Sequence, residues 1–404
     1  MAVRPELPAL TGLRGIAAGL IVLTHYTRWC APFDYHTLPQ TFERFCGALG
    51  ETAMTLFFTL SGFVIVYNYL DFPWRRRPLG SAARFIYLRF SRLYPALLLY
   101  VCVIVADPGI AKQYGDYFVP TLSMVLTFSQ TLVPIKWGGR LDTGFYVDWS
   151  LGTEMVLYVL FAAACAARAL PRAVARTLWI TGAACGSAIV LAGLNQHWLF
   201  PGFAAFPFIG EPLSDDEWAR WLFYLSPCLR AFDFAAGAAA ASVMLRYPER
   251  RESIRGKLAP ACLVLICGAL CARAMQLMDI DLARLQVIEA LGFAAIMAST
   301  QPETRMNRSL SWPGLTFVGE VSLSLYLFHV VAPRIVYAGG VGQFSVEAIP
   351  RYALNIIATS LFALAIAYGI HRLVERPAQS LLRSLWVRGP GRVGAPAVAP
   401  GAPA

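Results

Sequence analysis

The stretch that decides the fold is LTGLRGIAAGLIVLTHYTRW, residues 10–29. Most of its residues are Leu, Ile, Val, Ala or Gly, and about 20 predominantly apolar residues suffice for a helix that crosses the hydrocarbon core of a membrane. Arg14 lies near the start of the stretch and His25 near its end. The stretch therefore predicts a transmembrane helix that carries two ionisable side chains, which are costly to place in lipid.

Composition extends this prediction to the whole chain of 404 residues, of which 57% are hydrophobic and only 14% charged. Soluble domains have about 25% charged residues. The net charge of +10 comes from Lys and Arg in short connections between apolar runs, where basic residues set the orientation of membrane helices. Basic and aromatic residues are not interleaved as in single-strand binders. We therefore expect no nucleic-acid partner, and the spacing of the nine Cys predicts no metal site.

The number of membrane spans follows from the basic loops. If residues 118–134 span the membrane, the later basic loops fall outside the cell; if they do not, every basic cluster lies in the cytoplasm. We therefore predict an all-α polytopic membrane helix bundle of about ten transmembrane helices, with both termini cytoplasmic and 118–134 as a re-entrant or surface segment. The expected spans lie near 13–31, 49–70, 93–106, 148–167, 177–194, 221–245, 258–277, 285–300, 315–336 and 352–373.

The domain organisation is expected to be simple. Residues 1–380 form one transmembrane domain, and residues 381–404 form a cytoplasmic tail. The tail ends in GAPAVAPGAPA, residues 394–404, and such Pro/Ala low complexity predicts disorder.

The spacing of Arg14 and His25 predicts that both side chains face the same way. Eleven residues make three helical turns plus about 20°, so the two project from one face about 16 Å apart. Ionisable residues inside a membrane usually face a cavity and mark function. The alternatives are that Arg14 anchors the helix at the cytoplasmic boundary and that His25 is a buried, hydrogen-bonded imidazole.

Arg14, ten further residues and His25 resemble the signature of the acyltransferase family 3 membrane proteins. The resemblance continues in order along nearly the whole chain, in FFTLSGFVI (57–65), RFSRLYP (89–95), DWSLGTEMVLYVLF (148–161), SLSLYLFH (322–329) and VERP (374–377). Two positions depart from it. Tyr67 stands where some members carry Arg, and Gly152 and Thr153 replace the commoner Ser-Val.

The resemblance implies a multi-pass enzyme of the bacterial inner membrane. It would move an acyl group, with acetyl expected, from cytoplasmic acyl-CoA to a hydroxyl of a cell-surface or secreted carbohydrate: lipopolysaccharide, exopolysaccharide, a lipo-oligosaccharide or a glycoside. Acyl-CoA is a substrate, so no bound cofactor is expected. Arg14, Arg89 and Arg92 are assigned to the donor, because the guanidinium fork suits phosphates. Alternatively, Arg89 and Arg92 only keep their loop on the cytoplasmic side of the membrane, as basic residues in such loops commonly do.

His25 and Glu154 are the predicted catalytic residues. Histidine titrates near neutrality, so His25 suits either deprotonation of a hydroxyl or transient carriage of the acyl group, and both remain open. Glu154 is expected at a similar depth, where its carboxylate would orient the imidazole as the acid of a hydrolase triad does. The alternative for Glu154 is a role at the helix start.

Polar stripes supply the predicted substrate-binding residues. Ser150, Glu154 and Tyr158 share one helix face, and Ser322, Tyr326 and His329 share another. For the second stripe, structural hydrogen bonds between helices are the alternative. Arg230 and Asp233, three residues apart, are expected to neutralise each other, with acceptor binding as the alternative. We assign substrate binding to Ser61, Tyr158, Tyr326 and His329.

A transporter of a glycan lipid or small molecule is the competing interpretation. It would also have about ten spans and a cavity lined by charged residues. Transporters commonly contain paired repeats, however, and no second copy of the helix with Arg14 and His25 occurs in the other half of the chain.

Overall fold

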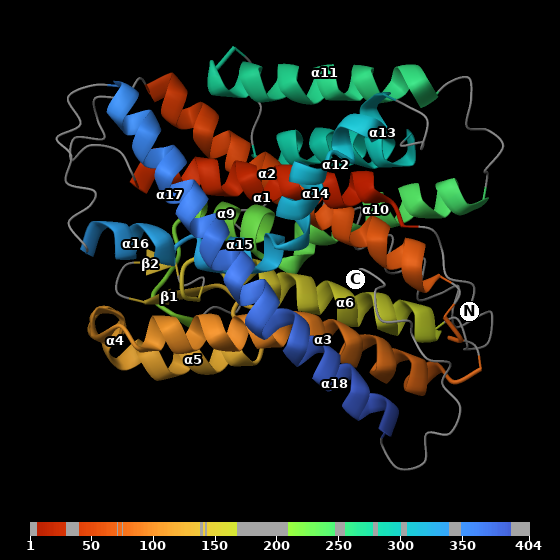
Figure 1. The fold of residues 1–404 in the computed structure, drawn as a ribbon, viewed down its shortest axis with the longest axis horizontal. Helices are drawn as coiled ribbons and strands as arrows, with labels where there is room; N and C mark the ends of the chain where they lie inside the picture. The colour runs from red at the N-terminus through yellow and green to blue at the C-terminus, as the bar shows by residue number, and fades with distance from the viewer. Residues whose placement is uncertain are drawn as a thin grey trace.

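The computed structural model describes residues 6–29, 40–70, 72–74, 76–137, 140–141, 144–167, 209–246, 255–277, 282–299, 305–338 and 349–388. Long α-helices dominate these residues (Figure 1). They are α1 (Pro8–Trp29), α2 (Gln40–Tyr69), α3 (Pro78–Val105), α6 (Trp149–Ala167), α10 (Pro227–Arg246), α11 (Arg255–Ala274), α12 (Leu282–Ser299) and α17 (Ile349–Ile370).

Shorter elements connect the long helices. They are α4 (Pro108–Tyr114), α5 (Phe118–Leu126), α9 (Asp215–Arg220), α13 (Arg305–Leu310), α14 (Pro313–Glu320), α15 (Ser322–Phe328), α16 (Val331–Ala338) and α18 (Arg376–Arg388). Strand β1 (Ile135–Trp137) pairs antiparallel with β2 (Arg140–Leu141) and parallel with β3 (Ile209–Gly210). This small sheet lies at the end of the bundle near α4 and α16 (Figure 1).

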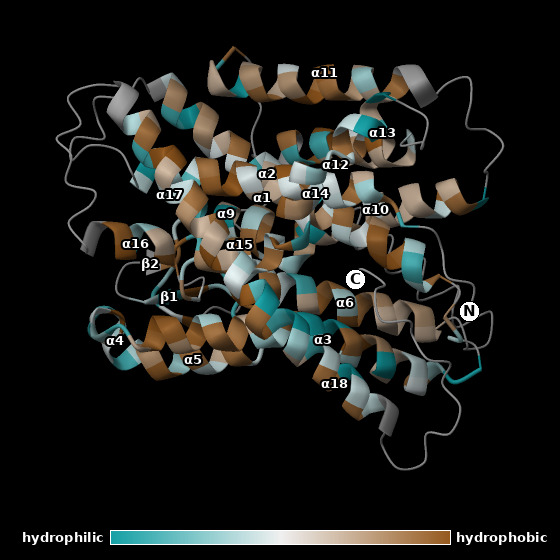
Figure 2. Ribbon diagram, viewed as in Figure 1, coloured by the Kyte–Doolittle hydropathy of each residue, from teal (hydrophilic) through white to brown (hydrophobic). Residues whose placement is uncertain are grey.

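The described helices confirm an all-α membrane protein. Six helical stretches are long and apolar enough to cross a membrane: α1, α2, α3, α6, α9 with α10, and α17 with α18. Two further apolar helices, Leu258–Ala274 and Leu285–Ser299, are shorter. Figure 2 shows apolar residues along most of these helices. The expected span at 177–194 lies outside the described residues, so the count of about ten and the cytoplasmic termini stay predictions.

Within residues 118–134 the helix is short. α5 has 9 residues and is therefore about 13–14 Å long, less than half of a hydrocarbon core of about 30 Å. A turn and strand β1 follow it. α5 therefore does not cross the membrane by itself, and the assignment of 118–134 as re-entrant or surface-lying stays a prediction.

The expected single span at 315–336 is instead broken into α14, α15 and α16. The breaks fall at Val321 and at His329–Val330. Non-helical backbone is tolerated at membrane depth where protein shields it. These three residues are at most 5% exposed, so protein surrounds both breaks. Hydropathy did not reveal them, because the broken segment is as apolar as a continuous helix.

Close packing of α14 against α1 fixes the helix that carries Arg14. A Cβ atom added to Gly15 would lie 2.3 Å from the carbonyl oxygen of Leu315, and one added to Gly319 would lie 1.9 Å from that of Thr11. Small residues allow membrane helices to approach this closely. The two glycines therefore set the distance between α1 and the broken helix.

Helix α18 continues to Arg388, beyond the expected domain boundary at residue 380. It packs against α3, where the Tyr87 hydroxyl donates a hydrogen bond to the carbonyl of Leu382 (2.7 Å) and the Tyr87 ring lies 4.6 Å from that of Trp386. Of the tail 381–404 that was expected to be disordered, residues 381–388 form the end of α18, and residues 389–404 lie outside the described residues.

Replacing Gly15 with alanine should destabilise the protein. The new methyl group would collide with the Leu315 carbonyl, and overpacking of this kind costs about 1–3 kcal/mol. Gly19→Ala is the matched control on the same helix, because a Cβ atom there meets nothing within 4 Å. Thermal unfolding of the detergent-solubilised protein should show a lower Tm for Gly15→Ala than for Gly19→Ala. Equal Tm values would contradict the close contact.

Candidate active site

A cavity opens inside the bundle between α1, α2, α3, α6 and α15. Its volume, open solvent at the mouth included, is about 760 Å³. Apolar side chains such as Phe57 and Leu93 form part of the wall. The polar and charged lining consists of Arg14, Ser61, Arg89, Arg92, Ser150, Glu154, Tyr158, Ser322 and Tyr326. The structure thus brings together every residue predicted for the site except the two histidines.

The cavity is strongly positive, since three arginines share it with a single carboxylate, that of Glu154. Arg14 comes from α1, and Arg89 and Arg92 come from consecutive turns of α3. The charge of Arg14 interacts with those of Arg92, Glu154 and Arg89. An uncompensated buried charge is expensive, so this surplus of cations favours an anionic ligand.

Two of these guanidinium groups have uncommitted N–H groups. Among the described residues Arg14 makes no hydrogen bond or ion pair. Arg89 is 3% exposed. Its Nη2 donates to the Tyr69 hydroxyl and its guanidinium lies 4.9 Å above the Tyr69 ring, but its Nε is buried with no partner. Buried donors of this kind are normally satisfied, and a bound anion would satisfy them.

The structure shows the hydrogen-bond partners of Glu154. Its Oε1 accepts hydrogen bonds from the Ser61 hydroxyl (2.9 Å) and from the Tyr158 hydroxyl. The two hydroxyl oxygens lie 3.1 Å apart. Glu154 therefore organises hydroxyl groups inside the cavity, and among the described residues it makes no hydrogen bond to His25. Similar depth along two helices does not fix which way each side chain points, and the catalytic role of Glu154 stays a prediction.

The partner of His25 is His329, which is fully buried. His25 Nδ1 lies 2.6 Å from His329 Nε2, and His329 Nδ1 lies 2.6 Å from the carbonyl oxygen of Tyr326. The Tyr26 hydroxyl donates to the carbonyl of His329 (2.8 Å). The His25 ring also stacks on Trp29, with ring centroids 4.7 Å apart, and the Trp29 ring lies 5.8 Å from that of His329. The imidazole of His25 is thus part of a cluster of three rings.

These hydrogen bonds assign the protons of the neutral histidine pair. A carbonyl oxygen only accepts, so His329 Nδ1 carries a hydrogen and His329 Nε2 is a lone-pair acceptor. His25 Nδ1 therefore donates to His329. In a neutral imidazole the other nitrogen is then unprotonated. This leaves His25 Nε2 as a base with its lone pair available.

Tyr326 connects the histidine pair with the cavity. Its side chain lines the cavity, and its ring centroid lies 6.1 Å from that of His329. The Tyr326 hydroxyl donates to the carbonyl of Val147 (2.6 Å) and accepts from the Ser150 hydroxyl (2.8 Å). The two histidines thus lie beside the cavity, on the far side of a hydrogen-bonded tyrosine.

Comparison with known proteins identifies the family. The family model described as an acyltransferase domain matches residues 7–372. The chain belongs to acyltransferase family 3. It is 26% identical over 391 residues to the acyltransferase MdmB of Streptomyces mycarofaciens, covering 93% of this chain and 92% of that protein. No solved structure matches the chain significantly.

Family membership confirms the resemblance seen in the motifs, and with the apolar helices it supports acyltransferase activity in a multi-pass membrane protein. Sequence reasoning missed one arrangement in this acyltransferase family 3 protein. His329 was expected to bind substrate or to make an interhelical hydrogen bond, and its pairing with His25 was not foreseen. The available signal was that the two histidines share a depth in the predicted bundle.

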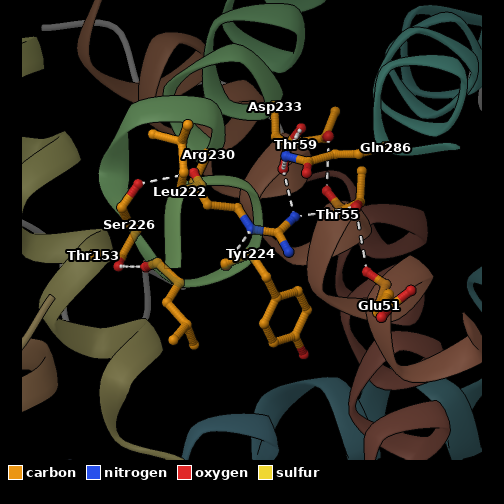
Figure 3. A network of polar contacts seen from close by, with 11 residues as sticks. Glu51, Thr55, Thr59, Thr153, Leu222, Tyr224, Ser226, Arg230, Asp233 and Gln286 are labelled. Carbon is orange, nitrogen blue, oxygen red and sulfur yellow. Dashed lines mark hydrogen bonds and ion pairs between the residues drawn. The ribbon is translucent and has the colours of Figure 1, made fainter. Parts of the chain in front are cut away.

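A second polar network, in the same acyltransferase family 3 bundle, joins α2, α10 and α12 (Figure 3). Arg230 and Asp233, both fully buried, form an ion pair of 2.8 Å, as their spacing predicted. Gln286 donates to both carboxylate oxygens of Asp233 (3.0 and 2.9 Å). Arg230 also donates to the Tyr224 carbonyl (2.9 Å) and to the Thr55 hydroxyl (3.2 Å). These charges hold three helices together.

Removing one partner of this ion pair should be more harmful than removing both. Asp233→Ala leaves the Arg230 charge buried and unpaired, which costs about 3–5 kcal/mol, whereas apolar replacement of a whole buried pair is often neutral. We expect a large loss of Tm in Asp233→Ala and partial recovery in the double variant Arg230→Met, Asp233→Leu. A double variant that is no more stable than the single one would argue against the ion pair as the cause.

Proposed function

We propose that the protein is an integral-membrane O-acyltransferase that moves an acyl group, with acetyl expected, from cytoplasmic acyl-CoA to a hydroxyl of a carbohydrate. The proposal places it in a bacterial inner membrane, acting on a cell-surface or secreted glycan or glycoside. The observation that carries it is the cavity in which Arg14, Arg89 and Arg92 converge beside a histidine with an available base nitrogen.

The cavity suits the acyl donor. CoA combines a phosphorylated nucleotide head with a long, thin pantetheine arm. Guanidinium groups hold phosphates through paired, charge-assisted hydrogen bonds, and Arg14 and Arg89 have uncommitted donors. The rise of about 16 Å along α1 from Arg14 to His25 is of the same order as the length of the arm. In this arrangement the thioester reaches the histidine while the charged head stays at the arginines.

The histidine pair suits the chemistry. In the proposed reaction His25 Nε2 accepts the proton of the acceptor hydroxyl as its oxygen attacks the thioester carbon. The new ester C–O bond forms, the C–S bond breaks, and the departing CoA thiolate takes the proton from His25. His329 accepts the hydrogen bond from His25 Nδ1 throughout and thereby fixes the tautomer and the ring, as the acid does in a hydrolase triad.

Two cavity groups are assigned supporting roles. Glu154 partly balances the arginines and orients the hydroxyls of Ser61 and Tyr158 toward the donor. Tyr326, between cavity and histidines, contacts the thioester end of the arm and moves aside or binds its carbonyl oxygen. In this proposal the polar side chains of the cavity bind the substrates, and His25, oriented by His329, transfers the proton.

A transporter is the competing candidate, favoured by one observation. The broken helix α14–α16 is of the kind that transporters place at their substrate sites. Family membership weighs against it, because the matching family and the relative MdmB are acyltransferases. The test below distinguishes the two functions.

Purified protein in detergent should release free thiol from acetyl-CoA when a glycan extract is present. His25→Ala should lower that rate by roughly 10²–10⁴-fold, which is the contribution of a general base, with Tm unchanged. Thiol release without acceptor that also requires His25 would identify an acyl-histidine step in place of direct transfer. A folded wild type that neither binds nor consumes acetyl-CoA would refute the donor assignment and favour the transporter.

His329 should affect turnover but not donor binding. In His329→Ala the His25 ring loses its hydrogen-bond acceptor, and misplacement of a catalytic group costs about 10²-fold in kcat. His329→Gln offers a side-chain oxygen to His25 Nδ1 and should restore part of that loss. KM for acetyl-CoA and Tm should stay near the wild-type values in both variants. Equal kcat losses in the two variants would show that His329 acts only through packing.

A further inference from the structure

Helix α18 lies beyond the residues that the family model matches, although its first two residues belong to the VERP motif. The family match ends at residue 372, whereas α18 spans Arg376–Arg388. The helix is fixed against α3 through Tyr87, which contacts Leu382 and Trp386. It runs beside the half of α3 that precedes the cavity arginines (Figure 1).

Unsatisfied hydrogen-bond donors concentrate on these two helices. Among the described residues, four buried side-chain N–H groups of α3 and α18 have no partner: Nε of Arg84, Nε of Arg89, Nε2 of Gln379 and Nε of Arg383. Leaving a buried donor unpaired costs about 1–3 kcal/mol, and more for a charged group. Two of these groups belong to Arg89 and Arg383, whose like charges repel each other across the two packed helices, and an acceptor-rich anion between them would satisfy both.

Arg383 joins this set to the cavity. Its positive charge lies close enough to those of Arg89 and Arg92 to be repelled by them, and Arg89 and Arg92 line the cavity. Gln379 precedes Arg383 by four residues, so both project from one face of α18. The positive surface of the cavity therefore extends past α3 onto the C-terminal helix.

We propose that Arg383 and Gln379 bind the phosphate-bearing head of the acyl donor and so form a second wall of the donor site. This inference rests on the function proposed above. A phosphate offers several acceptor oxygens and negative charge to guanidinium and amide donors, which matches what these side chains lack. The proposal extends the donor site from the family's arginines to residues outside the family match.

The hydropathy of the residues on α3 and α18 agrees with a binding site for a charged group between these helices. Figure 2 shows hydrophilic residues on α3 and α18, in contrast to the apolar α5 and α6 nearby. An anionic lipid headgroup carries the same phosphate chemistry. The donor is preferred because an anion between α3 and α18 would relieve the repulsion of Arg383 by the cavity residue Arg89, whereas a lipid would meet the exposed outer side of α18.

The test compares two donors that differ only in the head. Acetyl-CoA and S-acetyl-pantetheine share the thioester and the arm, but the second has no phosphate. For the full-length protein in detergent, Arg383→Gln should raise the Kd for acetyl-CoA roughly tenfold or more, the expected effect of losing a hydrogen bond to a charged group. The Kd for S-acetyl-pantetheine should not change.

Arg376→Gln is the matched control, because Arg376 is an exposed arginine on the same helix and the substitution removes the same charge. It should leave both Kd values unchanged. Arg383→Lys keeps the charge but loses the fork, so it should weaken acetyl-CoA binding less than Arg383→Gln. This variant tests the proposal if Arg383→Gln fails to fold, which the Tm reports.

The outcomes separate the two proposals. Wild-type affinity for acetyl-CoA in Arg383→Gln would overturn the second wall and leave the proposed function intact. A wild type that binds no acetyl-CoA would instead refute the proposed function. Bilayer discs with and without phosphatidylglycerol distinguish the lipid source. If Arg383→Gln loses only the stabilisation that this lipid gives, and still binds acetyl-CoA normally, then the site is a lipid site and the donor assignment is wrong.

Discussion

The cost of an unpaired charge inside the helix bundle organises this structure. Where charges serve the fold, the charge itself is paired: Arg230 and Asp233 form an ion pair of 2.8 Å and make further hydrogen bonds with the helices around them, although Arg230 Nη2 has no partner. Two of the cavity arginines have no such carboxylate among the described residues: Arg14 makes no hydrogen bond or ion pair, and Arg89, whose Nη2 donates to Tyr69, keeps a buried Nε unpaired. The absence of a paired carboxylate distinguishes these two arginines from the structural ion pair.

The broken helix α14–α16 makes the histidine pair possible. In a continuous helix the carbonyl of Tyr326 would accept a hydrogen bond from a backbone N–H four residues later. Because the helix ends near His329, that carbonyl accepts instead from the His329 ring. The break therefore converts a backbone group into the anchor that fixes one imidazole, which in turn fixes His25. Close packing at Gly15 holds α1 at the distance this chain of hydrogen bonds requires.

Sequence reasoning predicted the class, the family and most of the polar residues that line the cavity, because hydropathy, basic loops and motif spacing are local properties. Arg14, Arg89 and Arg92 line one cavity, and their role in donor binding stays a prediction. Sequence reasoning failed where the outcome depends on the direction of a side chain around its helix or on packing between distant segments. The predicted depth of Glu154 in the membrane suggested a contact with His25. In the structure the side chain of Glu154 points from α6 toward α2, where it accepts a hydrogen bond from Ser61. Neither the break at Val321 nor the extension of α18 leaves a hydropathy signal, since both arise from contacts with other helices.

The proposed separation of donor binding at the arginines from proton transfer at His25 follows from the chemistry of the two substrates. The phosphates of CoA are expensive to remove from water, so a membrane enzyme gains by holding them at the bundle's arginines and admitting only the thin, uncharged arm. The proton transfer needs the opposite surroundings, a neutral imidazole in a fixed tautomer beside the acceptor hydroxyl. Placing Arg14 and His25 on one face of one helix keeps the two environments a fixed distance apart. In the proposed function Tyr326, which lines the cavity and lies beside His329, separates the two environments until the arm is in place, and this would limit loss of the thioester to water.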